Sequence, residues 1–461
     1  MSYDVIIIGA GMSGLAAGIR LAYYDKKVCI LEKHHHVGGL NSFYSRDGHK
    51  FDVGLHAMTN YVPRGTKSTP LPKLLRQLKL KAEDFALCQQ RTSAVRFPEK
   101  TLRFNNNLEF FIQEVVENFP AQADNFHKLL KTISEYDALA LDAKPVSARE
   151  AVSTIISDPL LVDMIFCPLM YYGNAQENDM EFGQFVIMFR SILCEGFARP
   201  QAGVRQILDV LVKKYKDNGG ELRLKCGVKS IQVANGRVES VLLDNAEVLT
   251  ADSIISSAGY VETMRLLSNY NAKSFKNDVG RLSFVEFIMV LDRELAEVGY
   301  DTTIIFFNNS DRFSYRKPDD LVDVSSGVIC CPNNFYFESP LPEAMIRVTN
   351  MANFDLWNKL EQEEYKAQKA AWLETSLKEV VKFVPDFRDS IIYTDVFTPK
   401  TIHRFTGHLN GAVYGTPNKI KTGRTHLENL FICGTDQGFL GIVGAMLSGI
   451  SMANLHILQK G

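Results

Sequence analysis

The chain has 461 residues, of which 46% are apolar and 23% charged, and its 51 basic and 53 acidic side chains give a formal net charge of −2. This composition is typical of a soluble globular protein, and the length corresponds to about two to four domains. Because the charges nearly balance, we expect no large basic surface and therefore no nucleic-acid partner. Eight cysteines without a Cys-x-x-Cys pair predict free thiols, and no signal peptide or membrane-spanning stretch is recognised, so a cytoplasmic protein is expected.

The first 32 residues carry the pattern of a dinucleotide-binding unit. The predicted strand, helix and second strand cover residues 3–8, 15–24 and 27–31. Gly9, Gly11 and Gly14 form a G-x-G-x-x-G motif after the first strand. In this motif the first glycine permits a tight turn, the second lets backbone approach a pyrophosphate, and the third lets the helix pack on the strand. Glu32, at the end of the second strand, is placed to accept a hydrogen bond from a ribose hydroxyl and disfavours a 2′-phosphate.

The following segment extends the motif in a way that identifies a family. It reads His34-His35-His36-Val37-Gly38-Gly39-Leu40-Asn41-Ser42. Up to this point the chain resembles the flavin-dependent amine oxidase and carotenoid desaturase superfamily, in which a Gly-Gly turn approaches the FAD pyrophosphate a second time. The resemblance implies FAD as the cofactor, and the contacts that it implies here are Ser13, Lys33, Gly38, Gly39, Leu40, Asn41 and Ser42.

Leu40 and the three consecutive histidines are the unusual features of this segment. Leu40 stands where members of the superfamily often have a basic residue, and the Ser42 hydroxyl is available near the same place. The three consecutive histidines suggest a metal site, but neighbouring side chains in an extended segment alternate in direction and rarely converge on one ion. We therefore expect a solvent-exposed loop and no metal.

The C-terminal end carries a second cofactor signal. An apolar strand is predicted over 429–433, followed by a glycine-rich turn and a helix that runs to about residue 457. The superfamily closes its FAD site with a strand, a Gly-x-Asp turn and a helix start. The resemblance implies that Asp436 bonds the ribityl or pyrophosphate region and that the helix N-terminus near Val443 and Gly444 directs its dipole at the flavin ring. Gly434 and Gly441 are the further implied contacts.

The middle of the chain completes the expected fold class. After a helix over 203–217, the predicted strands are 221–224, 228–233, 238–243 and 252–259, with Asn235-Gly236 as a hairpin turn. In the family this hairpin lies near the adenine, and Val228 is the implied contact. The fold is therefore expected to be α/β, with an FAD-binding Rossmann-like domain of the glutathione reductase type interleaved with an α+β substrate domain. The FAD domain is predicted at 1–60, 200–265 and 420–461, and the substrate domain at 61–199 and 266–419.

Two further runs narrow the resemblance to one branch of the superfamily. Residues 51–56 read Phe-Asp-Val-Gly-Leu-His, and residues 398–415 contain Thr-Pro, Arg-Phe-Thr and Gly-Ala-Val-Tyr-Gly. Both are similar to carotenoid isomerase-like and retinol saturase-like proteins. The resemblance implies flavin-dependent desaturation, saturation or double-bond isomerisation of a long apolar polyene or acyl substrate. His56, Arg404 and Tyr414 are the candidate catalytic residues, with structural hydrogen bonding as the alternative for each.

Several questions stay open at the level of sequence. The apolar run 160–172 favours a buried core, with a substrate tunnel or a membrane-facing lip as the alternative. The resemblance leaves peripheral contact with a membrane open and leaves the electron partner unidentified. A flavin amine oxidase and a non-catalytic lipid carrier of the GDP-dissociation-inhibitor type share this superfamily or its fold, and they remain the alternative functions.

Overall fold

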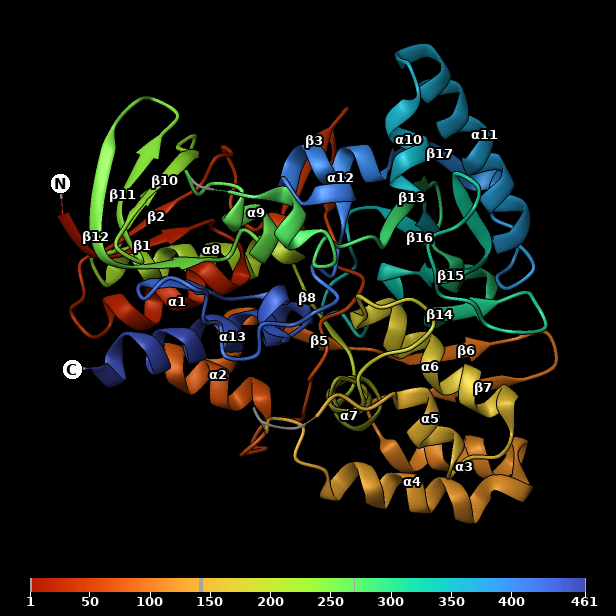
Figure 1. Ribbon diagram of the computed structural model, residues 1–461. Helices are drawn as coiled ribbons and strands as arrows, with labels where there is room; N and C mark the ends of the chain where they lie inside the picture. The colour runs from red at the N-terminus through yellow and green to blue at the C-terminus, as the bar shows by residue number, and fades with distance from the viewer. Residues whose placement is uncertain (1, 141–143, 269, 461) are drawn as a thin grey trace.

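Two seven-stranded sheets organise the protein, which we describe from a computed structural model over residues 2–140, 144–268 and 270–460 (Figure 1). The first sheet belongs to an α/β Rossmann-like domain, and the second is the mixed sheet of a second domain. This architecture confirms the predicted fold class. The exact residues at which one domain gives way to the other stay a prediction.

The first sheet is assembled from three separate parts of the chain. Its strands are β1 (Ser2–Ile8), β2 (Val28–Leu31), β9 (Glu221–Arg223), β10 (Val228–Ala234), β11 (Arg237–Leu243), β12 (Val248–Ser256) and β18 (Leu430–Ile432). They follow the order β10-β11-β12-β1-β2-β9, and β18 pairs with β12. The strands β1, β2, β9 and β18 join their neighbours in parallel, whereas β10, β11 and β12 form an antiparallel meander. Both ends of the chain therefore contribute strands to one sheet.

Alternation along β1 explains the layers on either side of this sheet. Val5 and Ile7 pack against the helices, and Ile6 and Ile8 pack against the β10–β11 hairpin. The covering helices are α1 (Met12–Ala22), α2 (Pro70–Leu78), α8 (Val204–Asp217) and α13 (Gly441–His456). Figure 1 shows these helices together beneath the sheet, with the N- and C-termini on the same side of the molecule.

The second sheet is mixed and carries helices on both faces. Its strands are β6 (Thr92–Arg96), β7 (Thr101–Phe104), β13 (Ser283–Leu291), β14 (Thr302–Asn308), β15 (Val322–Cys330), β16 (Ala344–Ala352) and β17 (Ile391–Phe397). The order is β17-β13-β16-β15-β14-β6-β7, with β14 parallel to β6 and the other pairs antiparallel. One face packs on α3 (Leu108–Asn118), α4 (Ala123–Glu135), α5 (Ala148–Ser153), α6 (Pro159–Gly173) and α7 (Phe182–Phe189). The other face packs on α10 (Phe354–Lys359) and α11 (Gln362–Val380).

Short elements join the two halves. They are α9 (Tyr260–Met264), α12 (Pro399–Thr406) and the strand pairs β3 (Phe43–Arg46) with β4 (His49–Asp52) and β5 (Leu87–Gln89) with β8 (Ala198–Pro200). Figure 1 places α12 and β3 between the two large sheets. Over the part of the chain that the structure describes, no helix has both the length and the apolar character that crossing a bilayer requires.

Gly14 sets the distance between α1 and the turn that precedes it. A Cβ atom placed on Gly14 would lie 2.1 Å from the carbonyl oxygen of Gly9, a distance that no packed side chain tolerates. The predicted packing role of Gly14 is therefore confirmed by the geometry. Gly9 itself has a φ of +93°, which favours glycine at this turn.

We predict that Gly14→Ala destabilises the whole fold, because the added methyl must push α1 away from the turn. Overpacking of this kind costs about 1–3 kcal/mol in the free energy of unfolding. Chemical denaturation of the variant and of the native protein measures the difference. An unchanged denaturation midpoint would contradict the close approach.

Candidate cofactor and substrate site

One elongated cavity of about 1070 Å³ lies between the two sheets and is lined by both of them. Its volume slightly exceeds the about 300–1,000 Å³ of ordinary ligand pockets. Most of the predicted site residues contribute to its wall. They are Gly9, Gly11, Ser13, Glu32, Lys33, Gly38, Gly39, Leu40, Asn41, Ser42, His56, Val228, Tyr414, Asp436 and Gly441.

The glycine turns form a cradle at one end of the cavity. Gly11 and Gly38 face each other as an isolated parallel bridge just before α1 begins at Met12. A Cβ atom on Gly11 would come no closer than 4.0 Å to any other protein atom, so it would project into the cavity. Backbone N–H groups at the start of a helix bind phosphate, and open space at Gly11 lets a pyrophosphate approach them.

Glu32 is held in one orientation beside this cradle. Its Oε2 accepts a hydrogen bond from the backbone N–H of Ala10 at 2.9 Å, and its Oε1 accepts one from the N–H of His34 at 2.9 Å. Each carboxylate oxygen keeps a further lone pair. The carboxylate is therefore preorganised to accept ribose hydroxyls, as the motif predicts.

Two buried ring nitrogens support a polar ligand at the same end. Among the described residues, His34 Nε2 and His408 Nδ1 are buried and have no hydrogen-bond partner, and both histidines line the cavity. Buried polar atoms are almost always paired in folded proteins, so such atoms indicate a missing partner. Val228 lines the cavity here together with Gly227 and Asp244. Phosphate cradle, ribose acceptor and unpaired nitrogens together fit the groups of FAD.

The histidine run is only partly the solvent-exposed loop that the sequence predicts. His35 and His36 are exposed, but His34 is partly buried, and burial is the main cause that lowers the pKa of His34. Within the described ranges, no group of three or more His, Cys, Asp or Glu side chains is arranged to hold a metal ion.

The carboxylate of Asp436 lines the cavity and already accepts hydrogen bonds from the protein. Oδ1 accepts the backbone N–H of Thr416 at 2.8 Å, and Oδ2 accepts that of Tyr260 at 2.5 Å. Asp436 is 2% exposed, and a Cβ on Gly415 would overlap its Oδ1. Asp436 therefore joins the loops after β12, α12 and β18 at the cavity wall, and its implied contact with the cofactor stays a prediction.

The C-terminal helix begins earlier than expected, which changes the residues that face the cavity. It starts at Gly441, so the wall consists of Leu440, Gly441, Ile442 and Ala445. Val443 is fully buried in the core beneath the first sheet. Val443, Gly444 and Gly434 do not line the cavity among the described residues, so their contact with the cofactor stays a prediction. Gly434 instead packs close to the side chain of Ser13.

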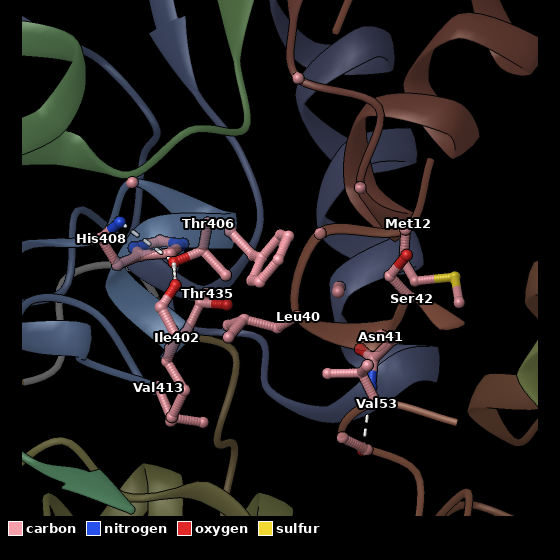
Figure 2. A pocket seen from close by; sticks show the side chains of 18 of the residues that line it. Met12, Leu40, Asn41, Ser42, Val53, Ile402, Thr406, His408, Val413 and Thr435 are labelled. Carbon is pink, nitrogen blue, oxygen red and sulfur yellow. Dashed lines mark hydrogen bonds between the residues drawn. The ribbon is translucent and has the colours of Figure 1, made fainter. Parts of the chain in front are cut away.

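Leu40 occupies the middle of the cavity. Figure 2 shows its side chain reaching between Ile402 and Thr435 on one side and Asn41 on the other. Asn41 is fixed by a bond from its Nδ2 to the Gly54 carbonyl at 3.0 Å. An apolar side chain therefore lies in the cavity wall where the superfamily often has a basic one.

The far end of the cavity is mostly apolar and aromatic. Three neighbouring strands of the second sheet contribute Phe284, Val328 and Thr349, and α6 contributes Tyr171 and Tyr172. Most of the remaining side chains of α6 are buried in the core, so the apolar run 160–172 is chiefly core and reaches the cavity only at its C-terminal end.

Of the candidate catalytic residues Tyr414 and Arg404, only Tyr414 lines the cavity among the described residues. Tyr414 lines the apolar end, donates a hydrogen bond to the Tyr171 carbonyl, and packs edge-on against Phe284. Arg404 is exposed on α12 with its guanidinium over Phe405, and it does not line the described cavity. A catalytic role of Arg404 stays a prediction that its exposed position does not support.

A buried ion pair beside His56 is the feature that the sequence did not predict. Glu286 on β13 and Thr349 on β16 each lie 3.1 Å from His56 Nε2, through Oε1 and Oγ1 respectively. Arg347 on β16 donates from Nε to the same Glu286 oxygen at 2.6 Å and is 1% exposed. Glu286 also lines the cavity, so a carboxylate lies in the wall of its apolar end.

A second ion pair supports the first one from behind. Arg199 pairs with Asp52 at 2.6 Å and donates to the carbonyl oxygens of Leu55 and His56. Arg347 also donates to the Leu55 carbonyl, at 2.9 Å. Arg199 and Arg347 therefore fix the backbone of Leu55 and His56 through hydrogen bonds to its carbonyl oxygens.

The ionisation of this cluster follows from burial and pairing. Burial pushes the pKa of Glu286 upward, but the charge and hydrogen bond of Arg347 and the contact with His56 together outweigh it and hold the pKa below its usual range. Burial lowers the pKa of His56 despite its contact with Glu286. With a neutral His56, two arginines and two carboxylates leave the cluster without net charge.

Comparisons with known proteins agree with this arrangement. Residues 7–78 match the model of the NAD(P)-binding Rossmann-like domain. Prolycopene isomerase 2 of an Oncidium hybrid cultivar is 25% identical over 98% of this chain and 83% of its own length, and 4,4′-diaponeurosporene oxygenase of Staphylococcus haemolyticus is 22% identical over 93% and 92%. A structure of putrescine oxidase superimposes with a TM-score of 0.66 at 15% identity, covering 100% of this chain and 99% of that one. The chain is thus distantly similar, over nearly its full length, to prolycopene isomerases and diaponeurosporene oxygenases, and it has the fold of the amine oxidase structure.

We predict that Gly11→Ala weakens FAD binding without destabilising the apoprotein. The φ of −73° at Gly11 suits alanine, and the methyl enters open space where a pyrophosphate would lie. Fluorescence titration of the apoprotein with FAD measures the dissociation constant, and denaturation of the same sample measures stability. Unchanged FAD affinity would contradict the assignment of the cradle.

A second prediction concerns the buried ion pair. Arg347→Leu leaves the carboxylate of Glu286 buried without its cation, which costs about 3–5 kcal/mol of the free energy of unfolding. The control Arg404→Ala removes an exposed arginine and changes stability by no more than about 0.5 kcal/mol. Urea denaturation compares the two variants, and equal effects would contradict the distinct placement of these arginines.

Proposed function

We propose that the protein is an FAD-dependent oxidoreductase that acts on carbon–carbon bonds of a long apolar polyene or acyl substrate, by desaturation, saturation or double-bond isomerisation. The observation that carries the proposal is the single cavity, which runs from the glycine cradle and Glu32 to an apolar wall of the second sheet. A cofactor bound in the cradle would share this enclosed space with its substrate. The names of the homologous proteins, a prolycopene isomerase and a diaponeurosporene oxygenase, support a carotenoid-type polyene.

Different residues of the chain would bind the cofactor and orient the substrate in such a reaction. FAD, when bound, supplies reversible transfer of a hydride equivalent. The glycine turns and Glu32 would hold its pyrophosphate and ribose, and the helix start at Gly441 would place a positive dipole end at the cavity. Phe284, Val328 and the tyrosines of α6 would orient an apolar chain and exclude water from it.

An amine oxidase is the second candidate, because aromatic rings surround a carboxylate in the same cavity. Tyr171, Tyr172, Phe284 and Tyr414 lie in the wall with Glu286, and aromatic rings attract cations. Arg347 neutralises Glu286, however, so the wall offers no net negative charge to a cationic substrate. The charge balance therefore favours the uncharged polyene.

A lipid carrier without redox activity is the third candidate. It would need the apolar end of the cavity but not the glycine cradle or the orientation of Glu32. Both features of the nucleotide end are intact, which supports the enzyme. A cytoplasmic location with peripheral contact at a membrane, where an apolar substrate would be collected, stays a prediction, and so does the identity of the electron partner.

The proposed function is tested by purifying the protein and recording its visible absorption spectrum before and after reconstitution with FAD. We expect bound flavin. Anaerobic mixing with carotenoids, retinoids and unsaturated fatty acyl compounds should then change the flavin redox state or the double-bond geometry of at least one class. A mixture of amines, including putrescine, is the comparison series.

Each outcome of this experiment selects a candidate. Failure to bind FAD would contradict the enzyme proposal, and a stable apoprotein that binds a prenylated protein would support the carrier. Reduction of the flavin by amines with release of peroxide would establish the amine oxidase instead.

A further inference from the structure

His56 occupies a position in which its protonation state is imposed by its neighbours. It lines the apolar end of the cavity, and its Nε2 contacts Glu286 and Thr349 at 3.1 Å each. Its Nδ1 has no hydrogen-bond partner among the residues that the structure describes. The two ring nitrogens are therefore in different situations, one bonded and one available.

Glu286 is the group that decides which nitrogen carries the proton. Its Oε1 accepts from Arg347 Nε at 2.6 Å and lies 2.5 Å from Arg347 Nη2. These two contacts to one oxygen, together with the contact to His56, outweigh burial and hold the pKa of Glu286 below its usual range, so the carboxylate is ionised. An ionised carboxylate can accept hydrogen bonds but cannot donate them.

The tautomer of His56 follows from this restriction. Nε2 must donate to Glu286 Oε1, because two acceptors at 3.1 Å would repel each other. Burial lowers the pKa of His56, so the ring is neutral near pH 7 and carries only this one proton. Nδ1 is consequently left with a lone pair, and His56 can accept a proton at Nδ1 but has none there to donate.

We propose that His56 is the catalytic base of a desaturation, accepting at Nδ1 the proton of a substrate C–H bond, and that Glu286 and Arg347 are positioning residues that fix its tautomer. The inference rests on the proposed function and favours desaturation over saturation. In a desaturation two C–H bonds of adjacent carbons break. The hydrogen of the first leaves as a hydride to oxidised FAD. The hydrogen of the second passes as a proton to the base, and the electron pair of that bond forms the new C=C bond. Saturation would need a proton donor, which the neutral tautomer of His56 is not.

The surroundings also stabilise the product of the proton transfer. A protonated His56 would lie 3.1 Å from the carboxylate of Glu286, in a region from which water is largely excluded. The titratable and charged groups around His56 are Glu286 on β13, Arg347 on β16, Arg199 on β8, Asp52 on β4, Cys330 on β15 and Tyr172 on α6.

The tautomer is tested directly by NMR on the FAD-reconstituted protein labelled with ¹⁵N-histidine. The chain has ten histidines, and the signals of His56 are identified by their loss in His56→Gln. At pH 7 we expect a neutral ring with a protonated Nε2 and an unprotonated Nδ1. A proton on Nδ1, or a charged imidazolium at pH 7, would overturn the inference without touching the proposed function.

The base role is tested by the pH dependence of anaerobic flavin reduction with a polyene that reacts in the panel above. The rate should fall toward low pH as Nδ1 becomes protonated, and His56→Gln should lower it about 10²–10⁴-fold. Glu286→Gln should move the acid limb to lower pH, because loss of a neighbouring carboxylate lowers the pKa of a histidine.

The matched control is Glu114→Gln, which changes another buried glutamate paired with an arginine, Arg103, away from the cavity. It should leave the acid limb in place. An acid limb that does not move in Glu286→Gln would overturn the positioning role, and flavin reduction that is insensitive to His56→Gln would overturn the base. A native protein that reacts with neither a polyene nor an unsaturated acyl compound would overturn the proposed function and this inference together.

Discussion

The close packing of α1 against α13 is the constraint on which the site depends, because it brings the two ends of the chain together. A Cβ on Gly449 would lie 2.0 Å from the backbone oxygen of Ser13, so the two helices touch through their backbones. Their strands, β1 and β18, lie on either side of β12 in one sheet. As a result, the helix starts at Met12 and Gly441 bound the same cavity, and two helix N-termini provide it with positive dipole ends.

The second constraint is the cost of burying charge. Glu286 lies in a strand whose other residues are apolar apart from Ser283, and Arg347 lies in a neighbouring strand of similar character. Breaking such a pair is expensive, but replacing it by apolar residues is often neutral or stabilising. A buried pair at the wall of a cavity therefore indicates a functional use. Here it orients His56 and removes the negative charge that a cationic substrate would need.

Local sequence patterns were sufficient for the first sheet, because glycine motifs, apolar runs and the Asn235-Gly236 turn act over short distances. Together with the family resemblance that they carry, they also predict the fold class and most of the site residues that line the cavity. Sequence patterns do not give the exact first residue of a helix. They predict the start of the C-terminal helix near Val443 and Gly444, whereas the helix begins at Gly441. The boundaries between the domains remain a prediction.

The charged cluster could not be derived in the same way, because its members are far apart in the chain. Glu286 is 230 positions from His56, and Arg347 is 61 positions from Glu286. One signal was present: a single charged residue inside each of two apolar strands predicts a buried partner. The motif in residues 398–415 predicts a catalytic role for Arg404, but the position of a residue in a motif does not reveal whether its side chain is exposed.

A crystal structure of the protein with FAD and a bound polyene tests the central claim most directly. The account predicts the dinucleotide in the cradle at Gly11 and Gly38, the flavin ring at the inner end of the cavity, and the polyene against Phe284 and Val328 within reach of His56 Nδ1. A flavin ring directed to solvent, or a polyene bound away from the wall that contains Glu286, would contradict it.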